Sequence, residues 1–253
     1  MNDFTGRVVL VTGAAGGIGA AAARQFAARG AHVVAADRSP CAETLAAITA
    51  AGGTAIAVGV DVADDASVAA MVASTIDRFG RLDAAFNNAG INERQARLHE
   101  SDLDEFERVI AINLRGVYLC MRHEIAAMLE HDPGHDRAIV NTSSGAGVVA
   151  APGNPAYTAA KHGVLGLTKL AASEYARDRI RVNAILPGPT DTPMLRASMD
   201  ANPGMEQFLT KVLPQGRLGT PDEVAEAAVW LCSPAATYVS GVSLLVDGGQ
   251  VNR

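Results

Sequence analysis

The sequence has few cysteines and few aromatic residues. Its three cysteines, Cys41, Cys120 and Cys232, lie far apart, and an odd number of separated cysteines predicts free thiols in a reducing compartment rather than a disulfide framework. Aromatic residues make up only 4% of the 253 residues, whereas 49% are hydrophobic. The core must therefore consist mainly of Ala, Val, Leu and Ile, which suits helices packed on a parallel sheet.

The sequence also lacks a cluster of positive charge and a long apolar run. The net charge is −6 and Lys and Arg are scattered, which argues against nucleic acid or an anionic membrane surface as a partner. Arg24 and Arg29 interrupt the alanine-rich stretch after Ala14 before it reaches the length of a membrane span. Residues 1–6 lack the basic and apolar regions of a signal peptide. We therefore expect a cytoplasmic protein.

A strand, a glycine turn and a helix are predicted in succession near the N-terminus. Residues 7–12 form a short apolar run and residues 20–29 favour a helix. The glycines between them fit Thr-Gly-x-x-x-Gly-x-Gly rather than Gly-x-Gly-x-x-Gly. Such a turn directs backbone N–H groups and the positive end of a helix at a phosphate, although tight packing alone would also favour glycine. The candidate phosphate-binding residues are Thr12, Gly13, Gly17, Ile18 and Gly19.

An acidic residue, Asp37, ends the next predicted strand. A carboxylate there accepts hydrogen bonds from the hydroxyls of an adenosine ribose and repels a 2′-phosphate, which favours NAD over NADP. Arg38 follows directly and could contact a phosphate, so NADP stays open. Asp61 and Val62, at the end of the third predicted strand, are placed to meet an adenine ring.

Two polar features come from the middle of the chain. Asn88, Ala89 and Gly90 follow a predicted strand at 82–86, where they either form a simple turn or line a cofactor cleft. Asn113 interrupts the apolar stripe of a long helix predicted over 103–129. A buried asparagine in a helix needs partners, so Asn113 is either a satisfied core amide or holds a water near Lys161.

Tyr157 and Lys161 lie one turn apart on a predicted helix that begins near Ala156, so that their side chains share a face. Tyrosine and lysine pair in this way by chance on many surfaces. An ammonium group beside a phenol favours the phenolate, so we expect the pKa of Tyr157 to fall toward neutrality. Such a tyrosine could exchange a proton with a hydroxyl or carbonyl oxygen. Ser144 would supply a second hydroxyl to the same oxygen.

The C-terminal part supplies groups for a carboxamide and a covering segment. A predicted strand at 181–186 is followed by Pro187, Gly188, Thr190 and Thr192, whose backbone and hydroxyl groups are available to a carboxamide. The Met-rich segment at about 189–214 suits a lid over an apolar pocket or an ordinary surface hairpin. The histidines at 131 and 135 flank a Pro-Gly turn, and we expect no metal site there.

The alternation of strands and helices from residue 7 to residue 246 predicts one parallel sheet of about seven strands with helices on both faces, a doubly wound α/β fold of the Rossmann type. The singled-out residues follow strands, so they converge at the carboxyl edge of the sheet. Over essentially its full length the chain resembles the short-chain dehydrogenase/reductase family. The motifs that carry this resemblance are Thr12-Gly13-x-x-x-Gly17-x-Gly19, Asn87-Asn88-Ala89-Gly90, Asn113, Ser144, Tyr157-x-x-x-Lys161 and Pro187-Gly188.

The resemblance implies a nicotinamide dinucleotide and a proton relay of Asn113, Ser144, Tyr157 and Lys161. By this resemblance Tyr157 is the acid/base, Ser144 orients the substrate oxygen, Lys161 lowers the tyrosine pKa and holds the nicotinamide ribose, and Asn113 positions a water. It also implies one catalytic domain, with a cofactor-binding part at about 1–140 and a catalytic part at about 141–253. A homotetramer is implied as well.

We therefore expect an oxidoreductase that transfers a hydride between NAD(H) and a secondary alcohol or ketone. One alternative is an NADPH-dependent carbonyl reductase, including the 3-oxoacyl type, against which Asp37 argues. Another is a non-catalytic dinucleotide-binding scaffold, which would not need a tyrosine with an altered pKa. The substrate itself does not follow from the sequence.

Overall fold

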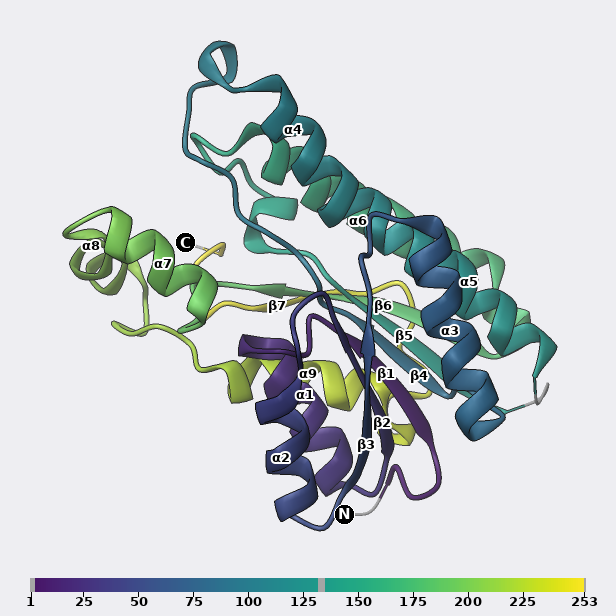
Figure 1. The fold of residues 1–253 in the computed structure, drawn as a ribbon. Coiled ribbons are helices and arrows are strands. Elements are labelled where there is room, and N and C mark those ends of the chain that lie inside the picture. The colour runs from purple at the N-terminus through teal and green to yellow at the C-terminus, as the bar shows by residue number, and fades with distance from the viewer. Residues whose placement is uncertain (1–2, 132–134, 253) are drawn as a thin grey trace.

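A parallel sheet of seven strands forms the centre of the computed structural model, which describes residues 3–131 and 135–252 (Figure 1). The strand order is β3-β2-β1-β4-β5-β6-β7, and all neighbouring strands are parallel. The chain winds from β1 to one edge and then, from β4, to the other, which confirms the predicted doubly wound fold. The strands are β1 (Val8–Thr12), β2 (His32–Asp37), β3 (Thr54–Gly59), β4 (Ala84–Asn87), β5 (Arg137–Thr142), β6 (Ile180–Pro187) and β7 (Ser243–Val246).

Helices cover both faces of the sheet, as predicted. One layer holds α1, α2 and α9, and the other holds α3, α5 and α6 (Figure 1). The described helices are α1 (Gly17–Ala28), α2 (Ala42–Ala50), α3 (Asp65–Phe79), α4 (Leu103–Ile110), α5 (Gly116–Glu130), α6 (Pro155–Glu174), α7 (Pro193–Ala201), α8 (Met205–Val212) and α9 (Pro221–Cys232).

Strand β1 shows why the sheet needs a helical layer on each face. All five of its residues are buried. Val9 and Val11 pack in the core beneath α1 and α9, whereas Val8 and Leu10 pack in the core beneath α3, α5 and α6. Because successive side chains of a strand point to opposite faces, a strand that is apolar at every position requires cover on both sides.

The long helix predicted over 103–129 is present, but its middle has a different geometry. A π turn at Ala111–Arg115 joins α4 to α5. Single π turns inside α-helices are rare and are frequent at functional sites. Asn113, the polar residue that interrupts the apolar stripe, lies within this turn and is fully buried.

Other elements differ from the predictions in detail. Asn87 is the last residue of β4 rather than the first residue after it. The Met-rich segment folds as two helices, α7 and α8, which project from the sheet beside its carboxyl edge (Figure 1). The predicted Pro-Gly turn at 132–134 lies outside the described residues. Among the described residues, no helix combines the length and apolar character needed to cross a bilayer.

Candidate active site

The ends of β1 and β4 meet at the point where the strand order reverses. The backbone N–H groups of Asn88 and Ala89 donate to the Thr12 hydroxyl at 3.0 and 3.2 Å. The Asn88 amide also donates to the Thr12 carbonyl at 3.4 Å. In sheets of this kind ligands bind at such a switch point, so these residues lie where a cofactor is expected.

The glycine turn after Thr12 leaves the start of α1 open to an anion. Gly13 and Gly17 have φ angles of 70° and 54°, a region that side-chain-bearing residues rarely occupy. A β-carbon on Gly19 would lie 2.1 Å from the Gly13 carbonyl oxygen, so the turn can fold back on the helix only with glycine there. Among the described residues, no side chain caps α1. Uncapped N–H groups at a helix N-terminus fit a pyrophosphate.

Asp37 is held in place by the backbone around it. One carboxylate oxygen accepts from the Ala15 N–H at 3.0 Å and the other from the Ser39 N–H at 2.8 Å. The carboxylate thus lies beside the glycine turn, where the ribose of a bound dinucleotide is expected. Arg38 is exposed to solvent.

The two residues predicted to meet the adenine follow β3. Asp61 accepts from the Ala63 N–H at 2.9 Å. Val62 is buried, and a β-carbon on Gly116 would lie 2.9 Å from its side chain. This end of the cleft is therefore packed against the first turn of α5.

Tyr157 and Lys161 lie together on α6 with Ser144 opposite them. Ser144 follows β5, its hydroxyl accepts from the Ala146 N–H at 3.1 Å, and it lies near enough to the Tyr157 phenol to lower the pKa of that group. The Lys161 ammonium donates to the Thr142 carbonyl at 2.8 Å and lies 5.4 Å from the centre of the Tyr157 ring. Two hydroxyl groups and a cation therefore converge on one place, as the sequence predicted.

The expected fall of the tyrosine pKa is wrong for this arrangement. Burial raises the pKa of Tyr157, and the hydrogen bond from Ser144 lowers it by less. Burial also lowers the pKa of Lys161 to about 8. The sequence revealed that the two side chains share a helix face, but it did not reveal how far the phenol is removed from water. Lys161 also lies over the ring face rather than at the phenol oxygen.

Asn113 is bonded at both ends of its amide. Its oxygen accepts from the Ile91 N–H and its nitrogen donates to the Ile91 carbonyl, both at 2.8 Å. A β-carbon on Gly90 would lie 3.1 Å from the Asn113 side-chain oxygen and 3.8 Å from the Lys161 nitrogen. The side chain is thus a satisfied core amide, and it stands next to Gly90 and Lys161.

The residues after β6 close the other side of the cleft. The Thr190 hydroxyl donates to the Gly188 carbonyl at 2.9 Å, and the Thr192 hydroxyl accepts from the Leu195 N–H at 3.2 Å as the cap of α7. A β-carbon on Gly17 would lie 3.3 Å from the Thr192 methyl group. The segment from Pro187 to Thr192 therefore reaches from the sheet to the glycine turn.

Sequence reasoning missed the buried polar groups that bond to Lys161 and to the end of β4. The Ser143 hydroxyl donates to the Lys161 carbonyl at 2.8 Å. The Asn87 amide donates to Glu124 at 2.9 Å and to Asn141 at 3.1 Å, all three side chains being buried. No local pattern marks such partners, because they come from different strands and helices. The only sign of these partners in the sequence is the presence of polar residues within otherwise apolar strands and helices.

The buried Glu124 predicts an unusual pH dependence of stability. Burial raises the pKa of this carboxyl to about 7, although the hydrogen bond from Asn87 lowers it. The folded protein then keeps a proton that the unfolded chain loses above its ordinary pKa, so stability falls as the pH rises through about 7. Glu124→Gln removes this titration. We expect the free energy of unfolding of Glu124→Gln, relative to that of the wild type, to increase by about 3 kcal/mol from pH 4.5 to pH 8.

Urea unfolding at both pH values measures this difference. The exposed Glu130→Gln serves as the control and should follow the wild type at both values. An identical pH dependence of Glu124→Gln and the wild type would show that Glu124 is already ionised in the folded protein.

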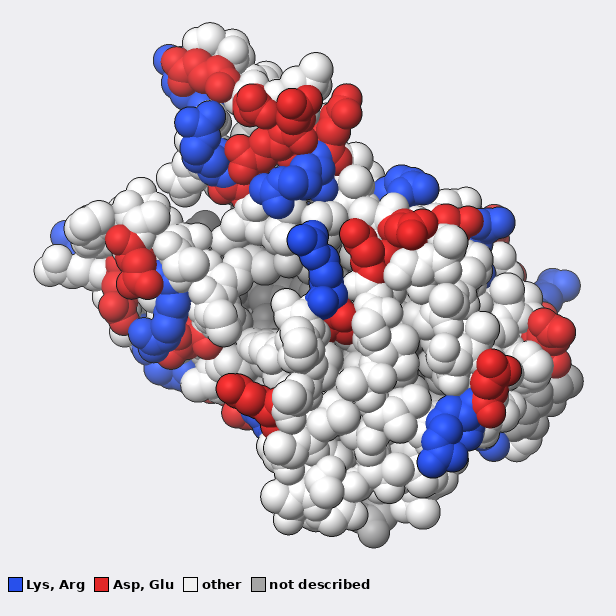
Figure 2. All heavy atoms as spheres, in the orientation of Figure 1, with Lys and Arg blue, Asp and Glu red and all other residues white. Residues whose placement is uncertain are grey.

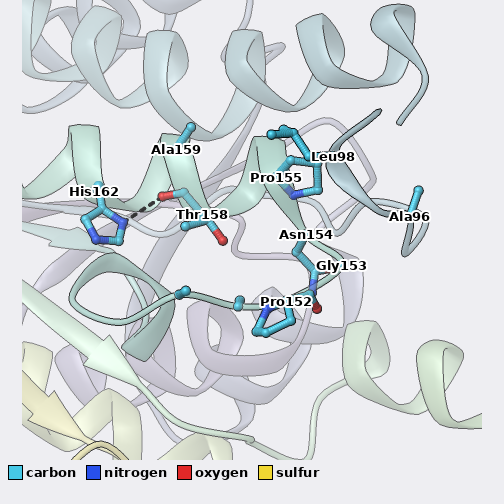
Figure 3. A pocket seen from close by; sticks show the side chains of 11 residues that line it. Ala96, Leu98, Pro152, Gly153, Asn154, Pro155, Thr158, Ala159 and His162 are labelled. Carbon is cyan, nitrogen blue, oxygen red and sulfur yellow. Dashed lines mark hydrogen bonds between the residues drawn. The ribbon is translucent and has the colours of Figure 1, made fainter. Parts of the chain in front are cut away.

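One pocket is lined by the start of α6 and by the two loops that precede it in space, at 96–98 and 150–155 (Figure 3). It has a volume of about 510 Å³ and is mostly apolar, between the loop at 96–98 and the loop at 150–155. Its α6 residues are Thr158, Ala159 and His162, which occupy a different side of that helix from Tyr157 and Lys161. Within residues 3–131 and 135–252, no group of His, Cys, Asp and Glu side chains is placed to hold a metal ion.

A doubly wound sheet with an uncapped glycine turn and a Ser-Tyr-Lys cluster defines a dinucleotide-dependent oxidoreductase. The family model that matches residues 13–250 is described as enoyl-(acyl carrier protein) reductase. A 2,5-dichloro-2,5-cyclohexadiene-1,4-diol dehydrogenase of Sphingobium indicum is 45% identical over 98% of both chains. A cis-4-hydroxycyclohexanecarboxylate dehydrogenase of Sinomonas cyclohexanicum is 47% identical over 97% of both.

A solved structure shows the same fold. The crystal structure of levodione reductase is 38% identical, covers 98% of this chain and 99% of its own, and gives a TM-score of 0.92. This chain belongs to the short-chain dehydrogenase/reductase family. It is an oxidoreductase that transfers a hydride between a nicotinamide dinucleotide and an alcohol or ketone.

Proposed function

We propose that this protein is an NAD-dependent dehydrogenase of secondary alcohols in which Tyr157 is the acid/base. The observation that carries the proposal is the buried Lys161, whose ammonium lies 5.4 Å from the centre of the Tyr157 ring, with Ser144 close enough to lower the pKa of the phenol. A nicotinamide dinucleotide bound at the edge of the sheet would supply the hydride acceptor for the alcohol or the hydride donor for the ketone. Tyr157→Phe tests the proposal, because it should keep NAD binding and lose turnover.

Each side chain of the cluster has a separate task. Tyr157 takes the proton of the substrate hydroxyl in oxidation and returns it to the carbonyl oxygen in reduction. Ser144 donates to the same oxygen and orients it. Lys161 would hold the nicotinamide ribose, and its positive charge over the tyrosine ring would oppose the rise of the Tyr157 pKa that burial causes. Asn113 fixes Ile91 and the adjacent strand end, and its helix holds a water of the proton relay.

The cofactor-binding residues follow the edge of the sheet. The glycine turn and the first turn of α1 would hold the pyrophosphate, Asp37 and the end of β3 would hold the adenosine, and the segment after β6 would hold the carboxamide. Since the Thr190 hydroxyl donates its proton to Gly188, we assign it only an acceptor role. We propose for this task Thr12, Gly13, Gly17, Ile18, Gly19, Asp37, Arg38, Asp61, Val62, Asn88, Ala89, Gly90, Tyr157, Lys161, Pro187, Gly188, Thr190 and Thr192.

Asp37 sets the preference for NAD in this proposal. Its carboxylate, fixed by the N–H groups of Ala15 and Ser39, accepts from the ribose hydroxyls and repels a 2′-phosphate. We expect Asp37→Ala to lower kcat/KM with NAD about tenfold or more and to shift the NAD/NADP ratio toward NADP. Initial rates with both cofactors measure the ratio.

Asp37→Asn is the matched variant, because it removes the charge and keeps an acceptor for one backbone N–H. It should raise kcat/KM with NADP and disturb the glycine turn less than alanine does. A ratio unchanged in both variants would assign the selectivity to Arg38 or the glycine turn, and would favour the NADPH-dependent carbonyl reductase.

The substrate class that we propose is a secondary alcohol on a carbon ring. Two relatives are named for cyclohexadiene-diol and hydroxycyclohexanecarboxylate substrates. Apolar side chains near the cluster and on the covering helices are exposed, namely Val148, Val149, Met194 and Phe208. Such a surface suits an apolar ring, and α7 and α8 would act as its lid. Residues 1–140 would then serve mainly the cofactor and residues 141–253 the substrate.

We also propose a homotetramer in the cytoplasm. Tyr118 and Leu129 on α5 and Leu170 on α6 are large apolar side chains that are 41–54% exposed, and such residues on neighbouring helices suit an interface between copies. Light scattering of the purified protein tests the assembly.

The three cysteines are buried thiols, which supports a reducing compartment. The net charge is −6, and acidic side chains crowd over α4 on the face in Figure 2; we propose no nucleic-acid partner.

A further inference from the structure

The catalytic helix α6 is capped by a residue from a distant loop. Its first residue is Pro155, which has no N–H group, and the side chain of the cap residue Asn154 donates to the Pro152 carbonyl. The carboxylate of Glu93 accepts instead from the next two N–H groups. It bonds Ala156 at 3.3 Å and Tyr157 at 2.7 Å.

The Glu93 carboxylate thus bonds the backbone of the tyrosine directly. A charged acceptor at a helix N-terminus satisfies the free N–H groups and interacts favourably with the helix dipole. Hydrogen bonds to a charged group are shorter and stronger than neutral ones. The position of Tyr157 therefore depends on where Glu93 lies.

Several elements fix the loop that carries Glu93. The Arg94 N–H donates to Glu105 of α4 at 2.8 Å, and the Ala96 N–H donates to the Gly153 carbonyl at 2.9 Å. The Asn92 amide donates to the Ser198 hydroxyl of α7 at 3.1 Å. The loop at 92–96 consequently connects α4, α6 and the covering helix α7.

We propose that Glu93 is a positioning residue for the acid/base tyrosine. Its carboxylate holds the first turn of α6 so that the Tyr157 hydroxyl meets Ser144 and the substrate oxygen together. An error of about 1 Å in the position of a reacting group lowers the rate about a hundredfold. The hydrogen bonds between Glu93 and the first turn of α6 should therefore affect kcat. The inference rests on the role of Tyr157 proposed above.

The test compares Glu93→Ala and Glu93→Gln with the wild type. We expect Glu93→Ala to lower kcat about tenfold to a hundredfold and to change the KM for NAD much less, because the proposed pyrophosphate and adenosine contacts lie at the glycine turn, Asp37 and the end of β3. Glu93→Gln keeps one acceptor oxygen and should recover part of the loss. Hydrogen exchange of the peptide over 155–158 should speed up in Glu93→Ala, which gives a readout independent of activity.

Glu223→Ala is the matched control. Glu223 also caps a helix, α9, with its carboxylate accepting from the Thr220 N–H at 2.8 Å, but α9 lies in the other helical layer. The Glu223→Ala variant should lose about as much stability as Glu93→Ala and keep the kcat of the wild type. A wild-type kcat in Glu93→Ala, or an equal loss of kcat in Glu223→Ala, would overturn the proposal. If Tyr157→Phe is active in the same assay, the proposed function fails instead.

Discussion

Tyr157→Phe should bind NAD like the wild type and lose turnover. We expect kcat to fall by about a hundredfold to ten-thousandfold, the range that general acid–base catalysis contributes. The phenyl ring keeps the packing on α6 and the contact with Lys161, which lies over the ring face. Only the phenol hydroxyl, which is the proton donor, is removed. Initial rates and a fluorescence titration with NADH measure the two properties separately.

Tyr175→Phe is the control for this experiment. Tyr175 caps the other end of α6 and packs in the core, so its hydroxyl should have no part in turnover. A Tyr157→Phe enzyme that keeps its kcat would contradict the proposed mechanism. A loss of NADH binding instead would show that the tyrosine serves the cofactor and not the proton.

Lys161→Met should change activity and stability in opposite directions. Lys161 is 3% exposed, and its burial lowers the pKa of the ammonium to about 8. Below that pH the folded protein holds a charge that is more costly than in the unfolded chain, and the cost fades as the pH rises from about 8 to about 10.5. The shift corresponds to about 3 kcal/mol, from which the lost hydrogen bond to Thr142 subtracts about 1 kcal/mol.

We therefore expect Lys161→Met to be about 2 kcal/mol more stable than the wild type at pH 7 and to lose kcat about a hundredfold or more. Guanidinium unfolding and initial rates measure the two effects. Lys169→Met removes an exposed lysine of the same helix and should change neither. A variant that is less stable and still active would contradict the role given to Lys161.

The fold could be predicted because its strands are apolar at nearly every position and alternate with amphipathic helices. The strand β1 is the clearest case, since a run such as Val8–Thr12 can be buried only between two helical layers. The place of the site followed from the same pattern, because the carboxyl ends of parallel strands meet at one edge. Thr12, Asp37 and Ser144 were proposed as site residues in this way.

The remaining features of the site depend on contacts between distant segments. The π turn around Asn113 forms where its amide bonds the backbone of Ile91, and no helix propensity encodes that contact. Glu93 lies in a polar loop whose sequence does not indicate that it caps α6. The pKa of Tyr157 was predicted with the wrong sign, because spacing on a helix reports neighbours and not the water removed around them.

The most direct test of the proposed function follows the hydride itself. Purified protein is incubated with NAD and a panel of cyclic and open-chain secondary alcohols that carry deuterium on the carbinol carbon, and the NADH is analysed by mass spectrometry. The proposal predicts one deuterium in each NADH formed, with the ring alcohols turned over fastest and Tyr157→Phe nearly inactive. NAD that binds but is not reduced by any alcohol of the panel, or NADH without deuterium, would contradict it.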